Sequence, residues 1–138
     1  MALVCDTGPL LAALDRGDPE HERCRALLTT GVEDLVVPGL VLSELDYWCD
    51  KIGINSAWLT FLDDVDAGVW RLEHPSLADL RRARDLQSAY GDLSLGVVDA
   101  SIVALCERLR EDKLATLDRR HFSVVRPGHV RALTLLPA

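Results

Sequence analysis

Short apolar runs alternate with amphipathic stretches along the chain, and the two patterns predict different elements. The short runs predict buried strands at residues 2–5, 35–37, 69–72, 114–117 and 130–136. Apolar residues spaced three and four apart predict helices at residues 7–14, 20–30, 38–52, 55–66, 77–90 and 97–110. Turn-forming residues separate these segments, including a turn between Gly31 and Asp34 and a turn-rich loop at residues 91–96.

This alternation of strands and helices predicts an α/β fold. Short apolar strands are typical of a parallel sheet that is buried on both faces by its crossover helices. We therefore expect one domain over residues 1–138, with three α/β/α layers and a central, mostly parallel sheet of five strands. Ligands of such open sheets bind beyond the carboxyl ends of the strands, so a functional site is expected at that edge.

Four acidic side chains fall near this predicted edge. Asp6 directly follows the first strand, and Asp118 directly follows the fourth. Asp99 lies in the first turn of the helix after the 91–96 loop, and Glu44 lies about two turns into the helix after the second strand. Buried carboxylates are costly unless they are paired, hydrogen-bonded or bound to metal. Acids gathered from such distant segments therefore favour a site for a divalent cation such as Mg²⁺.

Each of these acids also has a purely structural interpretation. Asp6 could cap the helix that starts at Thr7, and Asp99 could be favoured by the dipole of its own helix. Glu44 could be a partly exposed helix residue, and Asp118 could be a turn acid paired with a neighbouring arginine. The joint placement of the four acids is what favours the functional interpretation.

The net charge and its distribution along the chain indicate which kinds of partner the protein could bind. The formal net charge of −7 argues against a nucleic-acid partner. The charge is uneven, however, because residues 1–69 hold 4 basic and 13 acidic side chains, whereas residues 70–138 hold 11 basic and 9 acidic ones. This asymmetry leaves room for a basic surface beside an acidic site.

The cysteines and the N-terminal residues indicate the cellular compartment of the protein. Cys5, Cys24, Cys49 and Cys106 lack the spacing of a zinc site, so we interpret them as reduced, buried thiols. The first residues lack the basic and apolar regions of a signal peptide, and no apolar run approaches the ~20 residues that span a bilayer. We therefore expect a cytoplasmic protein that does not use a membrane.

Four segments of the chain resemble the motifs of PIN-domain nucleases, and among them those of the VapC toxins of bacterial VapBC toxin–antitoxin pairs. The segments are Leu-Val-Cys-Asp-Thr-Gly-Pro-Leu-Leu-Ala around Asp6, Val-Pro-Gly-Leu-Val-Leu-Ser-Glu-Leu around Glu44, Gly-Val-Val-Asp-Ala-Ser-Ile-Val-Ala-Leu around Asp99, and Ala-Thr-Leu-Asp-Arg-Arg-His-Phe around Asp118. They occur in the family's order and cover nearly the whole chain. Gly8-Pro9 departs from the Ser-Ala that relatives often carry, and should tighten the first turn without touching the chemistry.

This resemblance implies a PIN-like α/β/α fold and an endoribonuclease that depends on Mg²⁺ or Mn²⁺. It also implies a homodimer that a cognate VapB-type antitoxin inhibits. The family's catalytic and metal-binding acids carry over to Asp6, Glu44, Asp99 and Asp118. Thr7 and Thr116 resemble hydroxyls that flank the family's pocket, and Asp92 resembles a recurrent loop acid that either borders the pocket or caps the loop.

The mechanism that follows is a hypothesis with one open point. Asp6, Asp99 and Asp118 are expected to bind the metal, directly or through water, and Glu44 either completes the shell or orients the attacking water. In-line attack by water would leave a 5′-phosphate and a 3′-hydroxyl. Whether one metal or two is held stays open, because Mg²⁺ usually takes only one or two direct carboxylates.

Substrate RNA requires cations, and the sequence supplies several arginines. The candidates for phosphate contacts are Arg81, Arg82, Arg84, Arg119 and Arg120, although solvated helix faces and internal ion pairs are equally compatible with them. Trp48 and Trp58 could stack bases, but core or partner contacts are the favoured interpretation. His121 is expected to have a structural role, because a metal nuclease does not need it as an acid or base.

Two other functions compete with the nuclease. A non-catalytic PIN-like interaction module is the first alternative, and the presence of all four acids counts against it. An aspartyl-phosphate phosphatase is the second. That chemistry needs a second aspartate two residues after the nucleophile, whereas Asp6 is followed by Thr7 and Gly8.

Overall fold

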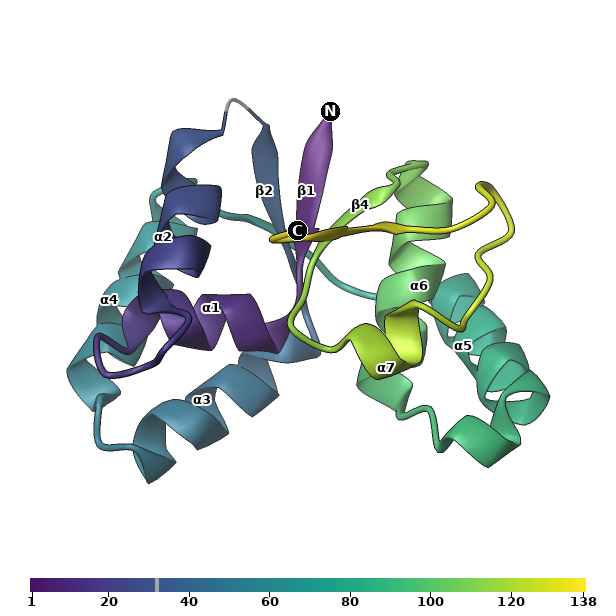
Figure 1. Cartoon of the computed structure of the whole chain (residues 1–138), viewed down its shortest axis with the longest axis horizontal. Helices are drawn as coiled ribbons and strands as arrows, with labels where there is room; N and C mark the ends of the chain where they lie inside the picture. The colour runs from purple at the N-terminus through teal and green to yellow at the C-terminus, as the bar shows by residue number, and fades with distance from the viewer. Residues whose placement is uncertain (32) are drawn as a thin grey trace.

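The computed structural model describes residues 1–31 and 33–138 and shows strands alternating with helices (Figure 1). The strands are β1 (Ala2–Cys5), β2 (Asp34–Pro38), β3 (Arg71–Glu73), β4 (Lys113–Ala115) and β5 (Thr134–Leu136). The helices are α1 (Thr7–Leu14), α2 (His21–Thr30), α3 (Val41–Lys51), α4 (Asn55–Asp66), α5 (Leu77–Ala89), α6 (Val97–Leu109), α7 (Arg119–Phe122) and the short 3₁₀ helix η1 (Gly91–Leu93). The predicted turn between Gly31 and Asp34 includes Val32, which lies outside the described residues.

The strands form one sheet in the order β3-β2-β1-β4-β5, and each described pair is parallel. β1 is the central strand, with Val4 paired to Val36 of β2 and to Leu114 of β4. These three side chains have no exposed surface, as the apolar strand pattern predicts for a sheet covered on both faces. The α/β fold with a five-stranded parallel sheet is therefore confirmed.

Helices cover the sheet in two groups. Figure 1 shows α1 to α4 on one side of the central strands and α5 to α7 on the other. Helix α6 is the most enclosed, because every residue from Ala100 to Cys106 is buried. The N-terminal end of α6 carries Asp99 beside this buried run. The four cysteines are free and buried, as the sequence predicted.

Several element bounds differ from the sequence-based prediction. The helix predicted from residue 38 begins at Val41, because Pro38 still pairs with Glu73 in the sheet. Glu44 therefore lies in the first turn of α3, not two turns into the helix. Three strands also have other bounds than predicted. The strands predicted at residues 69–72, 114–117 and 130–136 lie at residues 71–73, 113–115 and 134–136, because these residues pair with the neighbouring strands. Helix α7 was not predicted.

Within the described residues, none of the helices is both long and apolar enough to cross a bilayer.

Candidate metal centre

Asp6 occupies the junction between β1 and α1 and does two things there. It caps α1, because its Oδ1 accepts a hydrogen bond from the backbone N–H of Thr7 at 2.8 Å. Its Oδ2 accepts a second bond from the Thr116 hydroxyl, also at 2.8 Å. The structural alternative considered for Asp6, a cap of the helix that starts at Thr7, is therefore present as well. Asp6 is only 7% exposed, so its carboxylate is held at the carboxyl end of the central strand.

Two threonines connect the acids to one another. The Thr7 hydroxyl donates to Oε1 of Glu44 at 2.6 Å, which ties α3 to the start of α1. The buried Thr116 hydroxyl donates to Asp6 and accepts from the backbone N–H of Asp118 at 3.0 Å. The sequence predicted that Asp118 directly follows the fourth strand. In the structure it lies three residues after the end of β4. Thr116 therefore fixes where the chain turns back to bring Asp118 toward Asp6.

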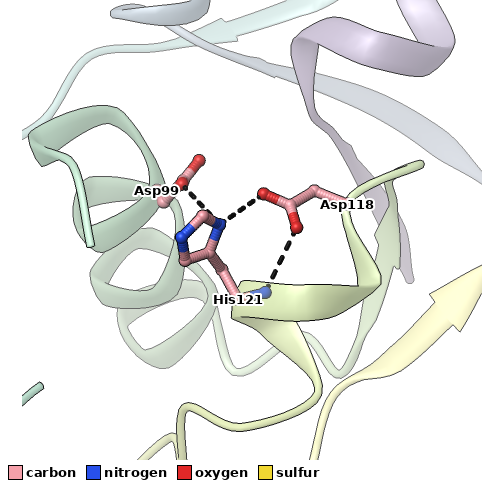
Figure 2. Close-up of side chains that lie close together, drawn as sticks. All are labelled: Asp99, Asp118 and His121. Atoms are coloured by element: carbon pink, nitrogen blue, oxygen red, sulfur yellow. Dashed lines mark hydrogen bonds and ion pairs between the residues drawn. The ribbon is translucent and has the colours of Figure 1, made fainter. Parts of the chain in front are cut away.

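His121 lies between Asp99 and Asp118, as Figure 2 shows. Asp118 caps α7 by accepting from the backbone N–H of His121 at 3.1 Å. The same cap brings the His121 ring onto the carboxylates, with Nδ1 2.6 Å from Asp118 Oδ2 and 3.6 Å from Asp99 Oδ2. One ligand atom from each of these three residues lies within 4.8 Å of the others. A single ion could be held by such a group.

Mutual repulsion among the acids is visible in their pKa values. Burial, together with the nearby charges of Asp6, Asp118 and Glu44, raises the pKa of Asp99 to about 6, against the attraction of His121. Burial likewise raises the pKa of Asp6, with Glu44 and Asp118 adding to the effect against its two hydrogen bonds. The four predicted acids therefore form one electrostatic cluster, although they come from distant segments. Such a cluster is stabilised by a cation.

His121 is electrostatically coupled to this cluster through Asp118. Although burial opposes it, hydrogen bonding from His121 lowers the pKa of Asp118 below its ordinary value. The bond to Asp118 in turn raises the pKa of His121. The sequence-based prediction gave His121 only a structural role and so missed this placement. One feature of the sequence could have indicated this placement. His121 lies three residues after Asp118, and a helix cap at Asp118 brings the two side chains together.

The donor set fits a divalent cation. Carboxylate oxygens from Asp6, Glu44, Asp99 and Asp118 are the ligands that Mg²⁺ and Mn²⁺ prefer. The hydroxyls of Thr7 and Thr116 hold two of these carboxylates in fixed orientations, as hydrogen bonds behind metal ligands generally do.

Asp92 lies apart from this cluster. It is exposed in η1 and lines a surface hollow of about 510 Å³ with residues that include Tyr90 and Val124. The next residue, Leu93, accepts from Nε2 of His121 through its carbonyl at 3.2 Å. The contact with His121 is thus made by the backbone of the neighbouring residue, and Asp92 does not cap η1, whose N-cap position is Tyr90.

The predicted RNA-binding arginines divide into two groups. Arg82 is not available for phosphate, because it forms a two-pronged ion pair with Glu107 at 2.8 and 2.9 Å that joins α5 to α6. Arg119 donates to the carbonyl of Pro137, and Arg84 pairs loosely with Asp85 at the surface. Arg81 and Arg120 are exposed. The ion pair at Arg82 supports the alternative that the sequence left open, an internal pairing, and it depends on helix packing that no local pattern reveals.

The two tryptophans also differ from each other. Trp58 stacks on Phe61 with ring centroids 6.0 Å apart, in agreement with a core contact. Trp48 is 47% exposed and meets Tyr47 edge to face.

Comparison with known proteins assigns the chain to a family. The family model of the PIN domain matches residues 3–126. Ribonuclease VapC26 of Mycobacterium tuberculosis is 34% identical over 136 residues, which is 98% of this chain and 100% of that protein. The chain therefore belongs to the PIN-domain family. Within that family it groups with the VapC proteins, because its similarity to VapC26 spans both chains almost completely.

Solved structures support the same fold. Mycobacterium tuberculosis VapC20, described as a sarcin-ricin loop cleaving toxin, superimposes with a TM-score of 0.82 at 19% identity and covers 94% of this chain and 99% of its own. VapBC2 from Rickettsia felis, bound to a fragment of its promoter DNA, matches with a TM-score of 0.69 at 17% identity over 98% of this chain and 97% of its own. At these identities the likeness concerns the fold alone.

Proposed function

We propose that this chain is a divalent-metal-dependent endoribonuclease and the toxin of a VapBC-type toxin–antitoxin pair. The observation that carries the proposal is the electrostatic cluster formed by Asp6, Glu44, Asp99 and Asp118 at the carboxyl edge of a PIN-domain sheet. The full-length similarity to a VapC ribonuclease supports the substrate class. A resident Mg²⁺ or Mn²⁺ would neutralise charge on the scissile phosphate and lower the pKa of the attacking water.

The protein's own residues position this chemistry. The Thr116 hydroxyl binds the carboxylate of Asp6 and the backbone N–H of Asp118, so it would set the separation of these two ligands of the ion. Asp99 would hold the ion from the first turn of α6. Glu44 is oriented by Thr7 and is the acid we assign to holding the attacking water in line. Fixed carboxylates lower the reorganisation needed in the transition state.

The arginines that remain free of strong internal pairs are the proposed RNA contacts. Arg81 and Arg120 are exposed, Arg84 has only a surface partner, and Arg119 lies at the start of α7 next to Asp118. Phosphate contacts of this kind position the backbone without reading sequence. Asp92 is proposed as an acid at the border of the pocket.

A cognate antitoxin and a homodimer complete the proposal. Support comes from the likeness of fold to toxin–antitoxin complexes, including one from Klebsiella pneumoniae with a TM-score of 0.68. Co-expression with the product of an adjacent short reading frame should yield a stable complex whose RNA cleavage is suppressed. Light scattering on the isolated chain should give the mass of two copies.

RNA cleavage with and without metal tests the proposed function. Purified protein should cleave RNA with Mg²⁺ or Mn²⁺ and stop when the ions are chelated. Asp99→Asn should lower the rate at least about 100-fold, because it removes a charge from the metal pocket. Asp63→Asn, an exposed carboxylate on α4, is the matched control and should retain activity. Metal-independent cleavage, or full activity in Asp99→Asn, would contradict the assignment, and failure to bind metal or cut RNA would favour the interaction module.

A further inference from the structure

The proposed nuclease leaves His121 without a task, although its ring lies inside the metal pocket. Nδ1 faces Oδ2 of Asp118 at 2.6 Å and Oδ2 of Asp99 at 3.6 Å. Nε2 faces the backbone carbonyl of Leu93 at 3.2 Å. The ring is therefore held from both ends, with one nitrogen directed at two proposed metal ligands (Figure 2).

The contact to Leu93 determines which nitrogen is available. A carbonyl oxygen only accepts hydrogen bonds, so Nε2 carries the hydrogen in that contact. Histidines that bind metals commonly donate their second N–H to a carbonyl or a carboxylate, which fixes both the tautomer and the ring orientation. The Leu93 carbonyl holds His121 in this arrangement, so that Nδ1 faces the pocket. Without an ion Nδ1 donates its hydrogen to Oδ2 of Asp118, and binding of an ion would release that proton.

The surrounding elements hold this ring in place. Asp118 accepts from the backbone N–H of His121, so the cap of α7 sets the distance between the ring and the carboxylates. Phe122, the next residue, is only 1% exposed, and it anchors α7 to the core. Ligand atoms from Asp99, Asp118 and His121 within 4.8 Å of one another are compatible with a shared ion.

We propose that Nδ1 of His121 is a direct ligand of the ion held by Asp99 and Asp118, and that it makes the site favour Mn²⁺ over Mg²⁺. The inference rests on the proposed function, because it takes the metal site of the nuclease as given. Mg²⁺ is a hard cation that takes oxygen ligands, whereas imidazole nitrogen is a better ligand for transition-metal ions. One nitrogen among carboxylates therefore shifts the preference of the site.

The experiment measures the ligand atom itself. Mn²⁺ is bound to the full chain, and pulsed electron paramagnetic resonance records nitrogen modulation of the bound ion. In protein labelled with ¹⁵N-histidine the modulation should change to that of ¹⁵N, which identifies histidine without any substitution. In His121→Gln the modulation should disappear. Absence of nitrogen modulation in the unlabelled parent, or its persistence in His121→Gln, would overturn the proposal.

Binding constants for Mn²⁺ and Mg²⁺ give the second readout. His121→Gln should weaken Mn²⁺ binding about 10- to 100-fold and change Mg²⁺ binding much less. His129→Gln is the matched control, because His129 contacts the carbonyl of Glu111 after the far end of α6 and a glutamine can keep that bond. Equal losses for the two ions would overturn the inference.

Asp99→Asn separates this inference from the proposed function. If the parent binds neither ion, or Asp99→Asn binds Mn²⁺ as well as the parent does, the metal site itself is wrong. If Asp99→Asn loses Mn²⁺ but no nitrogen signal is found in the parent, the metal site stands and the role of His121 is wrong.

Discussion

At the scale of single residues, Thr116 is the side chain on which the shape of the pocket most depends. Its hydroxyl donates to Asp6 and accepts from the N–H of Asp118, and the residue is 1% exposed. Without this link the buried Asp6 carboxylate would lose one of its two hydrogen bonds, and the backbone of Asp118 would lose the contact that places its turn.

Thr116→Val tests this dependence with a side chain of the same shape. We expect metal affinity to fall about 10- to 100-fold while the fold is retained, because a support behind the ligands is lost but no ligand is. Calorimetric titration with Mn²⁺ measures the effect, and circular dichroism checks the fold. Thr29→Val on the exposed face of α2 should leave the affinity unchanged. An unaltered affinity in Thr116→Val would show that the hydroxyl has no part in the site.

Asp99 illustrates how function opposes stability in this pocket. Its folded-state pKa of about 6 lies above the ordinary value of 3.8, so the ionised carboxylate destabilises the metal-free protein. That destabilisation is fully present above the folded pKa. It declines as the pH falls from about 6 toward 3.8, and it is absent below the ordinary value.

Asp99→Asn should therefore stabilise the metal-free protein while it removes activity. At neutral pH we expect a gain of about 1–2 kcal/mol in the free energy of unfolding, less than the full shift implies because the group is partly screened by solvent. Urea unfolding in the presence of a chelator measures the gain at neutral pH and near pH 4. The gain should disappear at the lower pH, and an equal gain at both values would rule out the carboxylate charge as its cause.

At the scale of elements, α5 and α6 are joined by a charged contact that excludes one arginine from RNA binding. Arg82 donates hydrogen bonds to both carboxylate oxygens of Glu107, and Glu107 also accepts one from the backbone N–H of Gly128. These bonds lower the pKa of Glu107, although burial acts in the opposite direction. Arg82 therefore supports the helix that carries Asp99.

Neighbouring substitutions on α5 should separate stability from RNA binding. Arg82→Ala should lower the free energy of unfolding by about 1 kcal/mol, because a two-pronged and partly buried pair is lost. Arg81→Ala should leave stability unchanged and weaken RNA binding modestly. Denaturant unfolding and filter binding on both variants measure the two effects. Equal stability losses in the two variants would contradict the assigned roles.

The elements also show what could be predicted from the sequence. The bounds of β1 and α6 were predicted well, because continuous apolar runs define both elements. The positions of Asp6 after β1 and of Asp99 in the first turn of α6 were therefore predicted as well. The four residues of α7 are too few to show any helical period, and the helix is defined by its Asp118 cap. The placement of His121 on the carboxylates depends on this cap, and its only trace in the sequence is the spacing of three residues from Asp118.

At the scale of the whole molecule, an acidic protein is proposed to bind an acidic polymer. The net charge of −7 repels RNA at long range, so attraction must be local to exposed arginines. Once Arg82 is excluded, the candidate phosphate contacts are Arg81, Arg84, Arg119 and Arg120.

RNA binding should accordingly show only a moderate dependence on salt. With at most these arginines on single-stranded phosphates, the slope of log affinity against log salt should be no steeper than about −3. Binding of a non-cleavable RNA measured over a series of salt concentrations gives this slope. A much steeper slope would mean that a larger basic surface, not identified among these arginines, contacts the RNA.

The most direct test of the central claim is a crystal structure of the chain with Mn²⁺, located by anomalous scattering. We predict an anomalous peak bounded by Asp6, Asp99 and Asp118. Glu44, which the hydrogen bond from Thr7 orients, should face this peak. Well-ordered crystals with no peak in this pocket, at Mn²⁺ concentrations that support RNA cleavage in solution, would contradict the claim that these acids form the catalytic metal site.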